Sequence, residues 1–288
     1  MKPKNLKTKI FLDSGDPEET KKAIDVLGFL DGQTTNPSLV AKNPEIIERI
    51  KKGNKFTKKQ TYAAYRKIIK DISSLIPRGS VSVEVYADFN TTASQMLKEA
   101  KEMSSWIPNA HIKLPIIKGG LVAAQKAIKE GVRVNMTLCF TQEQARAVSL
   151  ATRGAKKGDV FISPFIGRLD DIGIDGMSLI FNILKSYKKD KENHVEVLAA
   201  SVRNLSHFMS SLSLECDIIT APLSVLCEWA EKGCPVSRKS YPFRKDLKKI
   251  AFAKSLNLIK NWKKINIKNE LTRKGIERFC SDWDALSC

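Results

Sequence analysis

The feature of this 288-residue sequence that most restricts its fold is a repeated alternation of short apolar strands and amphipathic helices. Eight strand candidates occur, and a helix candidate follows each of them. The predicted strands cover residues 9–14, 32–37, 81–86, 110–115, 132–137, 160–163, 195–201 and 216–220. Alternating strands and helices are typical of a parallel sheet, and eight units in this length favour a (β/α)8 barrel. The sequence therefore predicts an α/β protein with a TIM-barrel architecture.

The alternative fold is a doubly wound sheet, but no GxGxxG motif follows the first predicted strand. We expect residues 1–232 to form the barrel as a single domain, and residues 233–288 to add C-terminal helices packed on it. Two adjacent glycines, Gly119 and Gly120, stand at the start of a predicted helix. They fit a phosphate-binding turn and a plain turn equally well.

Several classes of protein are disfavoured by composition. The six cysteines show no CxxC or CxxH spacing, and the three histidines are widely separated, so neither a metal site nor a bound cofactor is expected. The cysteines fit the reduced thiols of a cytoplasmic protein. The apolar run Ile10–Leu12 is too short for a signal peptide, and no run is long enough to cross a bilayer. We expect a cytoplasmic protein without a membrane partner.

The formal net charge of +18 raises the question of a nucleic-acid partner. Half of it lies in residues 238–264, which hold ten basic residues and one acidic residue. No stacking motif, recognition helix or finger pattern accompanies this basic span. We therefore interpret it as a solvated, Lys-rich surface and do not expect nucleic-acid binding, although a basic barrel without catalysis stays open as an alternative. Such a surface would also attract anionic sugar phosphates.

Polar residues recur where the predicted strands end, which is where barrel enzymes build their active sites. In the strand AHIKLP, Lys113 shares a face with His111, and Ile112 shares the other with Leu114. Taken alone, Lys113 fits a solvated surface lysine. The recurrence at strand after strand is hard to explain by packing. The recurring residues are Asp13, Asn36, Glu84, Lys113, Asn135, Thr137, Ser163, Ser201 and Arg203.

These residue types together indicate carbonyl chemistry. Loss of solvation disfavours an ammonium group, so an enclosed lysine becomes available as an amine nucleophile. Carboxylates such as Asp13 and Glu84 can move protons without a metal ion. Two arginines, Arg168 and Arg203, suit a phosphate group. The pattern predicts a Schiff-base enzyme that acts on a phosphorylated carbonyl compound.

The sequence resembles the transaldolase family, especially its shorter branch, which includes the fructose-6-phosphate aldolases. The matching segments keep their order over nearly the whole chain, and TTNPS, the IKLP lysine and SPFIGR are the most specific. They are FLDSGD (11–16), DGQTTNPSLVAK (31–42), VSVEVYAD (81–88), HIKLP (111–115), VNMTLCF (134–140), ISPFIGRLDDIGIDG (162–176), VLAASVRN (197–204) and LTRKGIERFCSDW (271–283).

The resemblance implies a role for each candidate residue. Lys113 would form the Schiff base with the C2 carbonyl of a ketose phosphate, and Asp13 would handle the proton of the C4 hydroxyl. Glu84 and Thr137 would hold the catalytic water. The remaining roles are binding of the dihydroxyacetone portion by Asn36, Asn135 and Ser163, and of the phosphate by Arg168, Ser201 and Arg203.

The resemblance also separates two activities. Transaldolases carry Glu where Glu84 stands and Phe where Phe165 stands, whereas the aldolases have Gln and Tyr. The resemblance therefore implies transfer of a dihydroxyacetone unit from sedoheptulose 7-phosphate to glyceraldehyde 3-phosphate, as in the pentose phosphate pathway. The alternative is a fructose-6-phosphate aldolase that releases free dihydroxyacetone. A homo-oligomer, either a dimer or a larger ring, is also implied.

Overall fold

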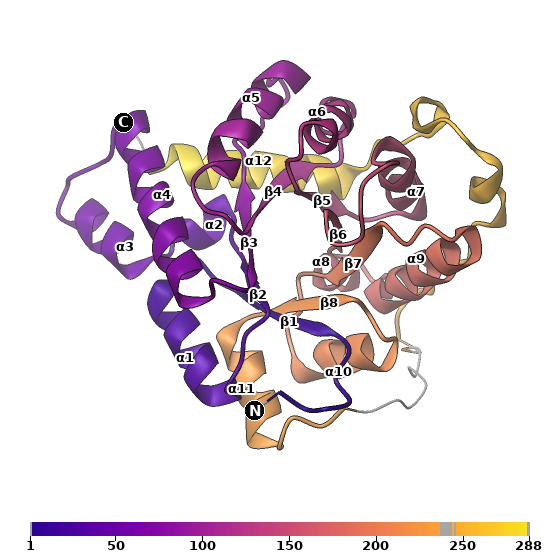
Figure 1. The fold of residues 1–288 in the computed structure, drawn as a ribbon, viewed down its shortest axis with the longest axis horizontal. Coiled ribbons are helices and arrows are strands. Elements are labelled where there is room, and N and C mark those ends of the chain that lie inside the picture. Colours follow the sequence, from indigo (N-terminus) through magenta and orange to yellow (C-terminus); the bar gives the residue numbers. More distant parts are fainter. Residues whose placement is uncertain (1, 237–243, 245, 287–288) are drawn as a thin grey trace.

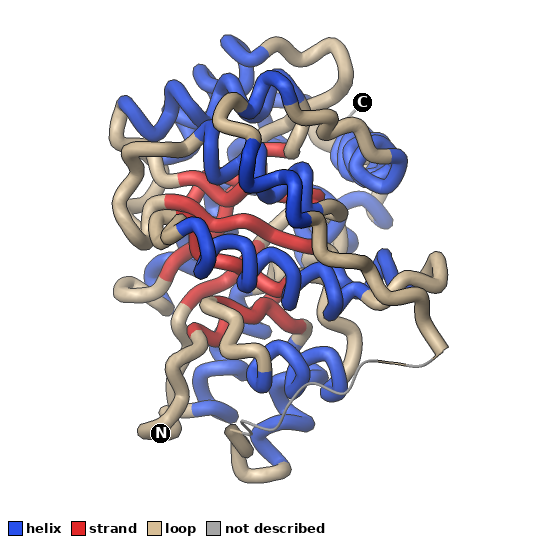
Figure 2. Tube along the Cα trace, turned by 90° about the vertical axis from the view of Figure 1, so that its right-hand side faces the viewer, coloured by secondary structure: helices blue, strands red, loops and turns tan. Residues whose placement is uncertain are grey.

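The computed structural model describes residues 2–236, 244 and 246–286, and it contains a closed barrel of eight parallel strands in sequential order. Figure 1 shows the ring of strands with helices around it, and Figure 2 shows the same strands from the side. The strands are β1 (Lys9–Asp13), β2 (Gly32–Thr34), β3 (Ser80–Glu84), β4 (Ala110–Pro115), β5 (Val134–Cys139), β6 (Val160–Pro164), β7 (Val195–Ala199) and β8 (Ile218–Ala221). The predicted TIM barrel is confirmed.

Helices follow the strands on the outside of the ring. They are α1 (Pro17–Leu27), α2 (Pro37–Val40), α3 (Pro44–Lys51), α4 (Lys58–Leu75), α5 (Ala93–Ser104), α6 (Lys118–Lys129), α7 (Gln142–Ala151), α8 (Ile166–Asp170), α9 (Gly176–Asp190), α10 (Leu205–Ser213) and α11 (Leu223–Glu231). Local sequence sets their ends: Asp16 accepts a hydrogen bond from the Glu18 backbone N–H at the start of α1, and Gly28 ends α1 in the left-handed conformation.

Most strand boundaries differ by one to three residues from the sequence-based prediction, and local backbone conformation explains two of the differences. The fifth strand begins at Val134, because the Val132 N–H is bonded to the Ala127 carbonyl at the end of α6. The seventh ends at Ala199 because Ser201 has a φ of 57°, which breaks the extended backbone. Asn135 and Thr137 stay within β5, whereas Ser201 lies in the loop after β7.

The inside of the barrel is filled in layers. At the N-terminal end, Lys9 pairs with Glu196 at 2.9 Å. Above this pair, the His111 ring stacks on Phe161 with centroids 3.9 Å apart, and Phe11 meets the edge of Phe161. These rings close the middle of the barrel, so polar residues near the C-terminal ends of the strands form a separate layer on the other side.

The extension after α11 is mostly irregular in its described part. It contains two short 3-10 helices, η1 (Lys254–Leu258) and η2 (Trp262–Lys264), and then α12 (Glu270–Asp284). Buried Arg146 of α7 holds the 3-10 region in place by donating hydrogen bonds to the carbonyls of Asn257 and Ile259. Part of the basic span, including residues 238, 239 and 245, and the C-terminal Cys288 lie outside the described residues.

Gly120 has a packing role that the sequence left undecided. A β-carbon there would lie 2.0 Å from the Pro115 carbonyl oxygen, so only glycine lets α6 approach the end of β4 this closely. This close approach explains Gly120 without any bound phosphate.

Candidate active site

A buried ion pair between Lys113 and Glu84 forms the centre of the C-terminal mouth. The two residues are opposite each other in the register of β3 and β4, and both side chains point into the barrel. Lys113 Nζ lies 2.6 Å from Glu84 Oε2, with the side chains only 4% and 5% exposed. Burial raises the pKa of the Glu84 carboxyl above its ordinary value, and the Lys113 ammonium partly offsets that rise.

Two residues that sequence reasoning missed hold this pair in place. Lys113 Nζ donates a hydrogen bond of 2.9 Å to the Thr35 carbonyl at the end of β2. Tyr65 of α4 reaches the same point from outside the ring: its hydroxyl accepts from the Glu84 backbone N–H and bonds the Thr35 hydroxyl. The Thr-Thr pair in TTNPS was a visible signal for Thr35, whereas Tyr65 gave only a helical, apolar spacing.

Asp13 reaches the same mouth from β1. Its Oδ1 accepts a hydrogen bond of 2.7 Å from the Thr34 hydroxyl, which in turn contacts the Thr220 hydroxyl at 2.6 Å. Burial raises the pKa of Asp13, and the Thr34 hydrogen bond and the nearby Lys113 charge work against that rise. A carboxyl with a raised pKa close to a lysine is suited to exchanging protons.

The next two strands add neutral polar groups beside Lys113. Asn135 lies opposite Lys113 in the register of β4 and β5. Its Oδ1 accepts from the Ser163 hydroxyl at 2.7 Å, and its Nδ2 donates to Ser82 Oγ at 3.1 Å. Thr137 is fully buried, and its hydroxyl has no hydrogen-bond partner among the described residues. An unpartnered buried hydroxyl is costly, so this position fits contact with a bound molecule or water.

Arg168 lies in α8, and Phe165 is the N-cap residue that joins β6 to this helix. The Arg168 guanidinium lies 5.3 Å from the centre of the Phe165 ring. Burial lowers its pKa, and its charge is close enough to Glu84 and to Arg203 to interact with both. Within the described residues no carboxylate pairs with Arg168, which leaves this cation free for an anion.

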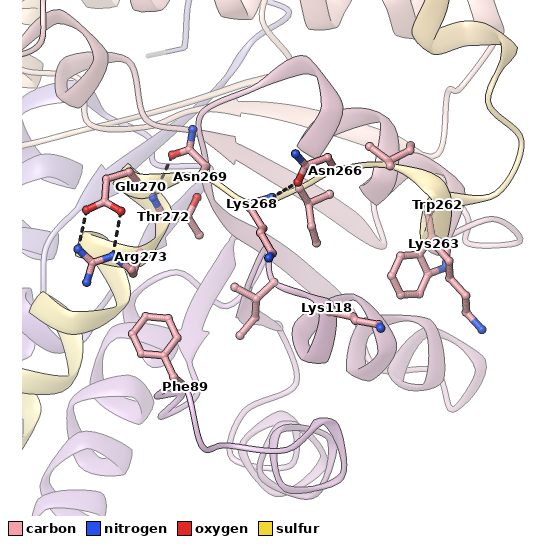
Figure 3. Close-up of a pocket in the computed structure, with 13 residues that line it drawn as sticks. Phe89, Lys118, Trp262, Lys263, Asn266, Lys268, Asn269, Glu270, Thr272 and Arg273 are labelled. Carbon is pink, nitrogen blue, oxygen red and sulfur yellow. Dashed lines mark hydrogen bonds and ion pairs between the residues drawn. The ribbon is translucent and has the colours of Figure 1, made fainter.

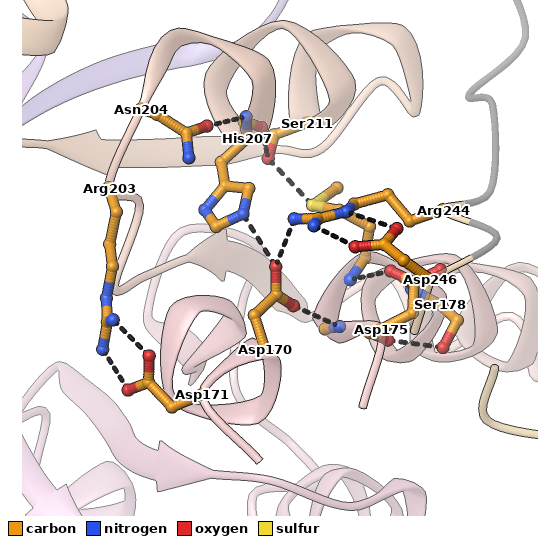
Figure 4. Close-up of polar contacts among 12 residues, drawn as sticks. Asp170, Asp171, Asp175, Ser178, Arg203, Asn204, His207, Ser211, Arg244 and Asp246 are labelled. Atoms are coloured by element: carbon orange, nitrogen blue, oxygen red, sulfur yellow. Dashed lines mark hydrogen bonds and ion pairs between the residues drawn. The ribbon is translucent and has the colours of Figure 1, made fainter. Parts of the chain in front are cut away.

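Arg203 and Ser201 lie next to α8 on the loop after β7. Figure 4 shows Arg203 facing Asp171, whose carboxylate receives two of its N–H groups. The Gly167 N–H donates to the Ser201 carbonyl at 3.1 Å. A β-carbon on Gly167 would lie 2.4 Å from that oxygen, so this glycine allows α8 and the loop to meet. An anion that binds Arg203 must compete with Asp171.

A second carboxylate, that of Asp170, anchors α8 to its neighbouring helices. Asp170 Oδ2 lies 2.9 Å from His207 Nε2 of α10, and Asp170 Oδ1 accepts from the Gly176 N–H at the start of α9 (Figure 4). These contacts, and the neighbouring charge of Arg244, lower the pKa of Asp170, although burial opposes that effect. The helix that carries Arg168 is therefore anchored to two other helices.

The helix α12 covers this mouth, a contact that the sequence did not predict. The Phe279 ring lies 5.8 Å from Lys113 Nζ and 5.6 Å from the Arg168 guanidinium, measured to the ring centre. A β-carbon on Gly275 would lie 2.9 Å from Arg168 Nη1, so glycine permits this approach. The space left beside Glu84 and Phe279 is only ≈ 10 Å³. The side chains of α12 therefore leave little free space on this side of Glu84.

Asn36 is placed differently from the other predicted residues. Its side-chain oxygen caps α2 by accepting from the Leu39 N–H at 2.9 Å. The carboxamide NH2 group remains for other contacts, and Asn36 directly follows Thr35, whose carbonyl bonds Lys113. Within the described ranges no cluster of three His, Cys, Asp or Glu side chains could hold a metal ion.

Comparison with known proteins identifies the family to which the chain belongs. The family model described as Transaldolase/Fructose-6-phosphate aldolase matches residues 10–288. The chain belongs to this family. It is therefore an enzyme of the transaldolase type.

Relatives of the family match at moderate identity. A probable transaldolase of Dehalococcoides mccartyi is 39% identical over 76% of this chain and 89% of its own. One from Leptospira biflexa is 40% identical over 75% and 87%, and one from Brucella ovis is 36% identical over 96% of both chains. A solved orotidine 5'-monophosphate decarboxylase from Methanocaldococcus jannaschii has a TM-score of 0.48 at 13% identity, covering 81% of this chain and 99% of that one.

The transaldolase-type enzyme carries no spanning helix in its described part, since none of the helices there is both long and apolar enough to cross a membrane.

Proposed function

We propose that this enzyme is a transaldolase that works through a Schiff base on Lys113. It would move a dihydroxyacetone unit from sedoheptulose 7-phosphate to glyceraldehyde 3-phosphate, giving erythrose 4-phosphate and fructose 6-phosphate, and catalyse the reverse. The observation that carries the proposal is the burial of Lys113 inside the mouth, 2.6 Å from Glu84 and within electrostatic range of Asp13. The expected substrates are sugar phosphates.

The first step needs a neutral amine. Lys113 must lose a proton before it attacks the C2 carbonyl, and Glu84 is the acceptor within reach because burial raises its pKa. The attack forms a carbinolamine, which loses water to give a protonated imine. The unpartnered hydroxyl of Thr137 and the carboxyl of Glu84 would hold that water.

The second step breaks the C3–C4 bond. Asp13 takes the proton of the C4 hydroxyl, the bonding electrons move into the imine, and the aldose phosphate leaves. The enamine that remains attacks the aldehyde carbon of the acceptor, and Asp13 returns the proton to the new C4 oxygen. Hydrolysis of the imine then frees the product, so no oxidant or metal is consumed.

Binding groups surround the reacting carbons. Asn135 and Ser163 lie beside Lys113 and would bind the hydroxyls of the dihydroxyacetone portion, together with Asn36. The phosphate would be bound by Arg168, Ser201 and Arg203, and Arg203 would exchange Asp171 for the phosphate. Remote binding energy of this kind positions the reacting atoms.

Phe165 favours transfer over cleavage. Its ring lies at the mouth near Arg168, and it has no hydroxyl that could protonate the enamine. The enamine would therefore wait for an acceptor aldehyde. In a Phe165→Tyr variant, fructose 6-phosphate alone should release more free dihydroxyacetone than it does with the parent enzyme. Unchanged release would count against the argument from proton delivery.

Borohydride trapping tests the central step. Fructose 6-phosphate with borohydride should add the reduced dihydroxyacetone unit to one lysine, and peptide mapping should place it on Lys113. Lys9 is the matched control, because it also points into the barrel and pairs with a glutamate, but at the opposite end. Labelling of Lys9, or none at all, would refute the proposal. The homo-oligomeric state and the cytoplasmic location stay predictions.

A further inference from the structure

A second cavity, larger than the space beside Glu84 and Phe279, lies on the same face of the barrel. Its volume is ≈ 690 Å³, within the range usual for small-molecule sites. Its walls come from the loop after β3, the start of α6 and residues 262–273, which lead into α12 (Figure 3). None of the candidate active-site residues lines it, so it does not belong to the site proposed for sugar phosphates.

The floor of this cavity is apolar and carries an exposed aromatic ring. Ile117, Ile265 and Ile267 line it, beside the buried Trp262. Phe89 stands at the edge with 55% of its surface exposed, the most of any aromatic side chain that the structure describes. Figure 3 shows this ring across the cavity from Trp262. An aromatic face left bare beside a cavity can stack on a planar ligand.

The rim of the cavity is cationic. Lys118, Lys263 and Lys268 line it, all exposed, and none of them has an ion-pair partner among the described residues. The one carboxylate of the lining, Glu270, is already bound by Arg273, with Nε 2.9 Å from Oε2. The lining therefore carries the net charge of three lysines. The start of α6 adds positive potential, because its N-cap residue, Ile117, has no side-chain acceptor for the free backbone N–H groups of the first turn.

Two amides complete the lining with hydrogen-bond donors. Asn266 Oδ1 accepts from the Lys268 N–H at 3.1 Å, and Asn269 Oδ1 accepts from the Leu271 N–H at 2.9 Å. The backbone thus occupies both side-chain oxygens and fixes both side chains, which leaves their NH2 groups to donate. Donors of this kind fit the ring nitrogens and hydroxyls of a planar, sugar-linked ligand.

We propose that this cavity binds a nucleoside phosphate, with its base against Phe89 and its phosphates between Lys118, Lys263 and Lys268. An exposed aromatic ring favours a planar ligand that can stack on it. Three unpaired ammonium groups favour an anion with more than one charge. A sugar phosphate satisfies only the second requirement and fills less of the volume. A second copy of this chain is disfavoured as the occupant, because a symmetric contact here would bring two sets of these three unpaired lysines together.

Calorimetric titration with ADP tests the proposal, with adenosine and pyrophosphate as the two halves of the probe. ADP should bind at least about tenfold more tightly than either half, since both parts of the cavity contribute. Replacing Lys118, Lys263 and Lys268 by Gln should weaken ADP binding about tenfold or more, and Phe89→Ser should weaken ADP but not pyrophosphate. The control variant replaces Lys22, Lys188 and Lys189, which are exposed on α1 and α9, and should bind ADP as the parent does.

Several outcomes would overturn the proposal. If pyrophosphate binds as tightly as ADP, the lysines form only a general anion surface. If a short poly-glutamate peptide binds more tightly than ADP, the occupant is an acidic protein segment. Loss of ADP binding in Arg203→Gln would place the nucleotide at the phosphate side of Lys113 instead. Failure of the transaldolase assay leaves this test unaffected, because its readout is binding alone.

Discussion

The ion pair of Lys113 and Glu84 should contribute a coupling free energy that an exposed pair of the same length does not. The buried pair is 2.6 Å long with side chains 4% and 5% exposed. Lys113→Met or Glu84→Gln alone leaves the other charge buried without its partner, which costs roughly 3–5 kcal/mol of unfolding free energy. The double variant removes both charges and should lose no more than either single variant. The cycle should therefore give a coupling of about 3 kcal/mol or more.

The chain offers a matched control for this cycle. Lys101 and Glu130 are also 2.6 Å apart, but their side chains are 54% and 40% exposed. Solvent screens such a pair, so Lys101→Met with Glu130→Gln should give a coupling of at most ~1 kcal/mol.

Equilibrium urea unfolding, followed by circular dichroism, measures both cycles. The m-values should stay constant, so that shifts in midpoint report stability. A coupling at Lys113 and Glu84 no larger than at Lys101 and Glu130 would refute the reasoning. It would mean that the buried carboxyl and amine are not held as a charged pair.

Three further predictions follow from other contacts. Burial lowers the pKa of His111 from 6.5 to about 3, so the folded chain binds this proton less tightly than the unfolded chain. Stability should fall as pH drops from about 6.5 towards 3, by about 1.4 kcal/mol per pH unit for this group, and His111→Gln should lose that dependence. Gly275→Ala would place a β-carbon 2.6 Å from Leu138 Cδ2 and 2.9 Å from Arg168 Nη1, so it should cost roughly 1–3 kcal/mol of stability and raise KM for a sugar phosphate roughly threefold to tenfold. Arg146→Met should cost roughly 3–5 kcal/mol and expose residues 254–264 to protease, since it removes the buried partner of Asp190 and the hydrogen bonds to the Asn257 and Ile259 carbonyls.

Each of these three has its own check. Unfolding free energies compared between about pH 4.5 and 6 test His111, and equal slopes in both proteins would contradict the assignment. For Gly275→Ala, a change in kcat with KM unchanged would argue against an effect on Arg168. For Arg146, the control is Arg153→Met, which removes a contact to the same Glu192 from a side chain that is 49% exposed. Similar losses in both would contradict a special role for the buried arginine.

Much of the barrel could be predicted from sequence because its signals are local. The alternation of apolar and polar residues predicted that Glu84, Lys113 and Asn135 lie near the ends of consecutive strands. The register of parallel strands then brings these three side chains together. The helix caps at Asp16 and Gly28 were equally visible. The predicted start of the fifth strand was wrong because a hydrogen bond between the Val132 N–H and the Ala127 carbonyl of α6 decides it.

The contacts that were missed are long-range. Phe279 meets Lys113 only because α12 returns across the mouth, and no spacing in the sequence signals that path. Tyr65 binds the Glu84 backbone through a helix whose pattern indicated packing alone. Asp171 is close in sequence to the predicted phosphate residue Arg168. Nothing in the sequence pattern indicated that its carboxylate would pair with Arg203, where an anion was expected to bind. Side-chain competition of this kind becomes visible only in three dimensions.

The order of synthesis gives the position of α12 a consequence in the cell. The ribosome has made all eight strands by Ala221, whereas the helix that covers Lys113 begins only at Glu270. N-terminal parts of a chain can fold while the rest is being translated. A nascent chain that pauses between these two points would present an uncovered amine to every free aldehyde around it. If Lys113 has the proposed reactivity, slow translation through this interval would expose the new chain to chemical damage.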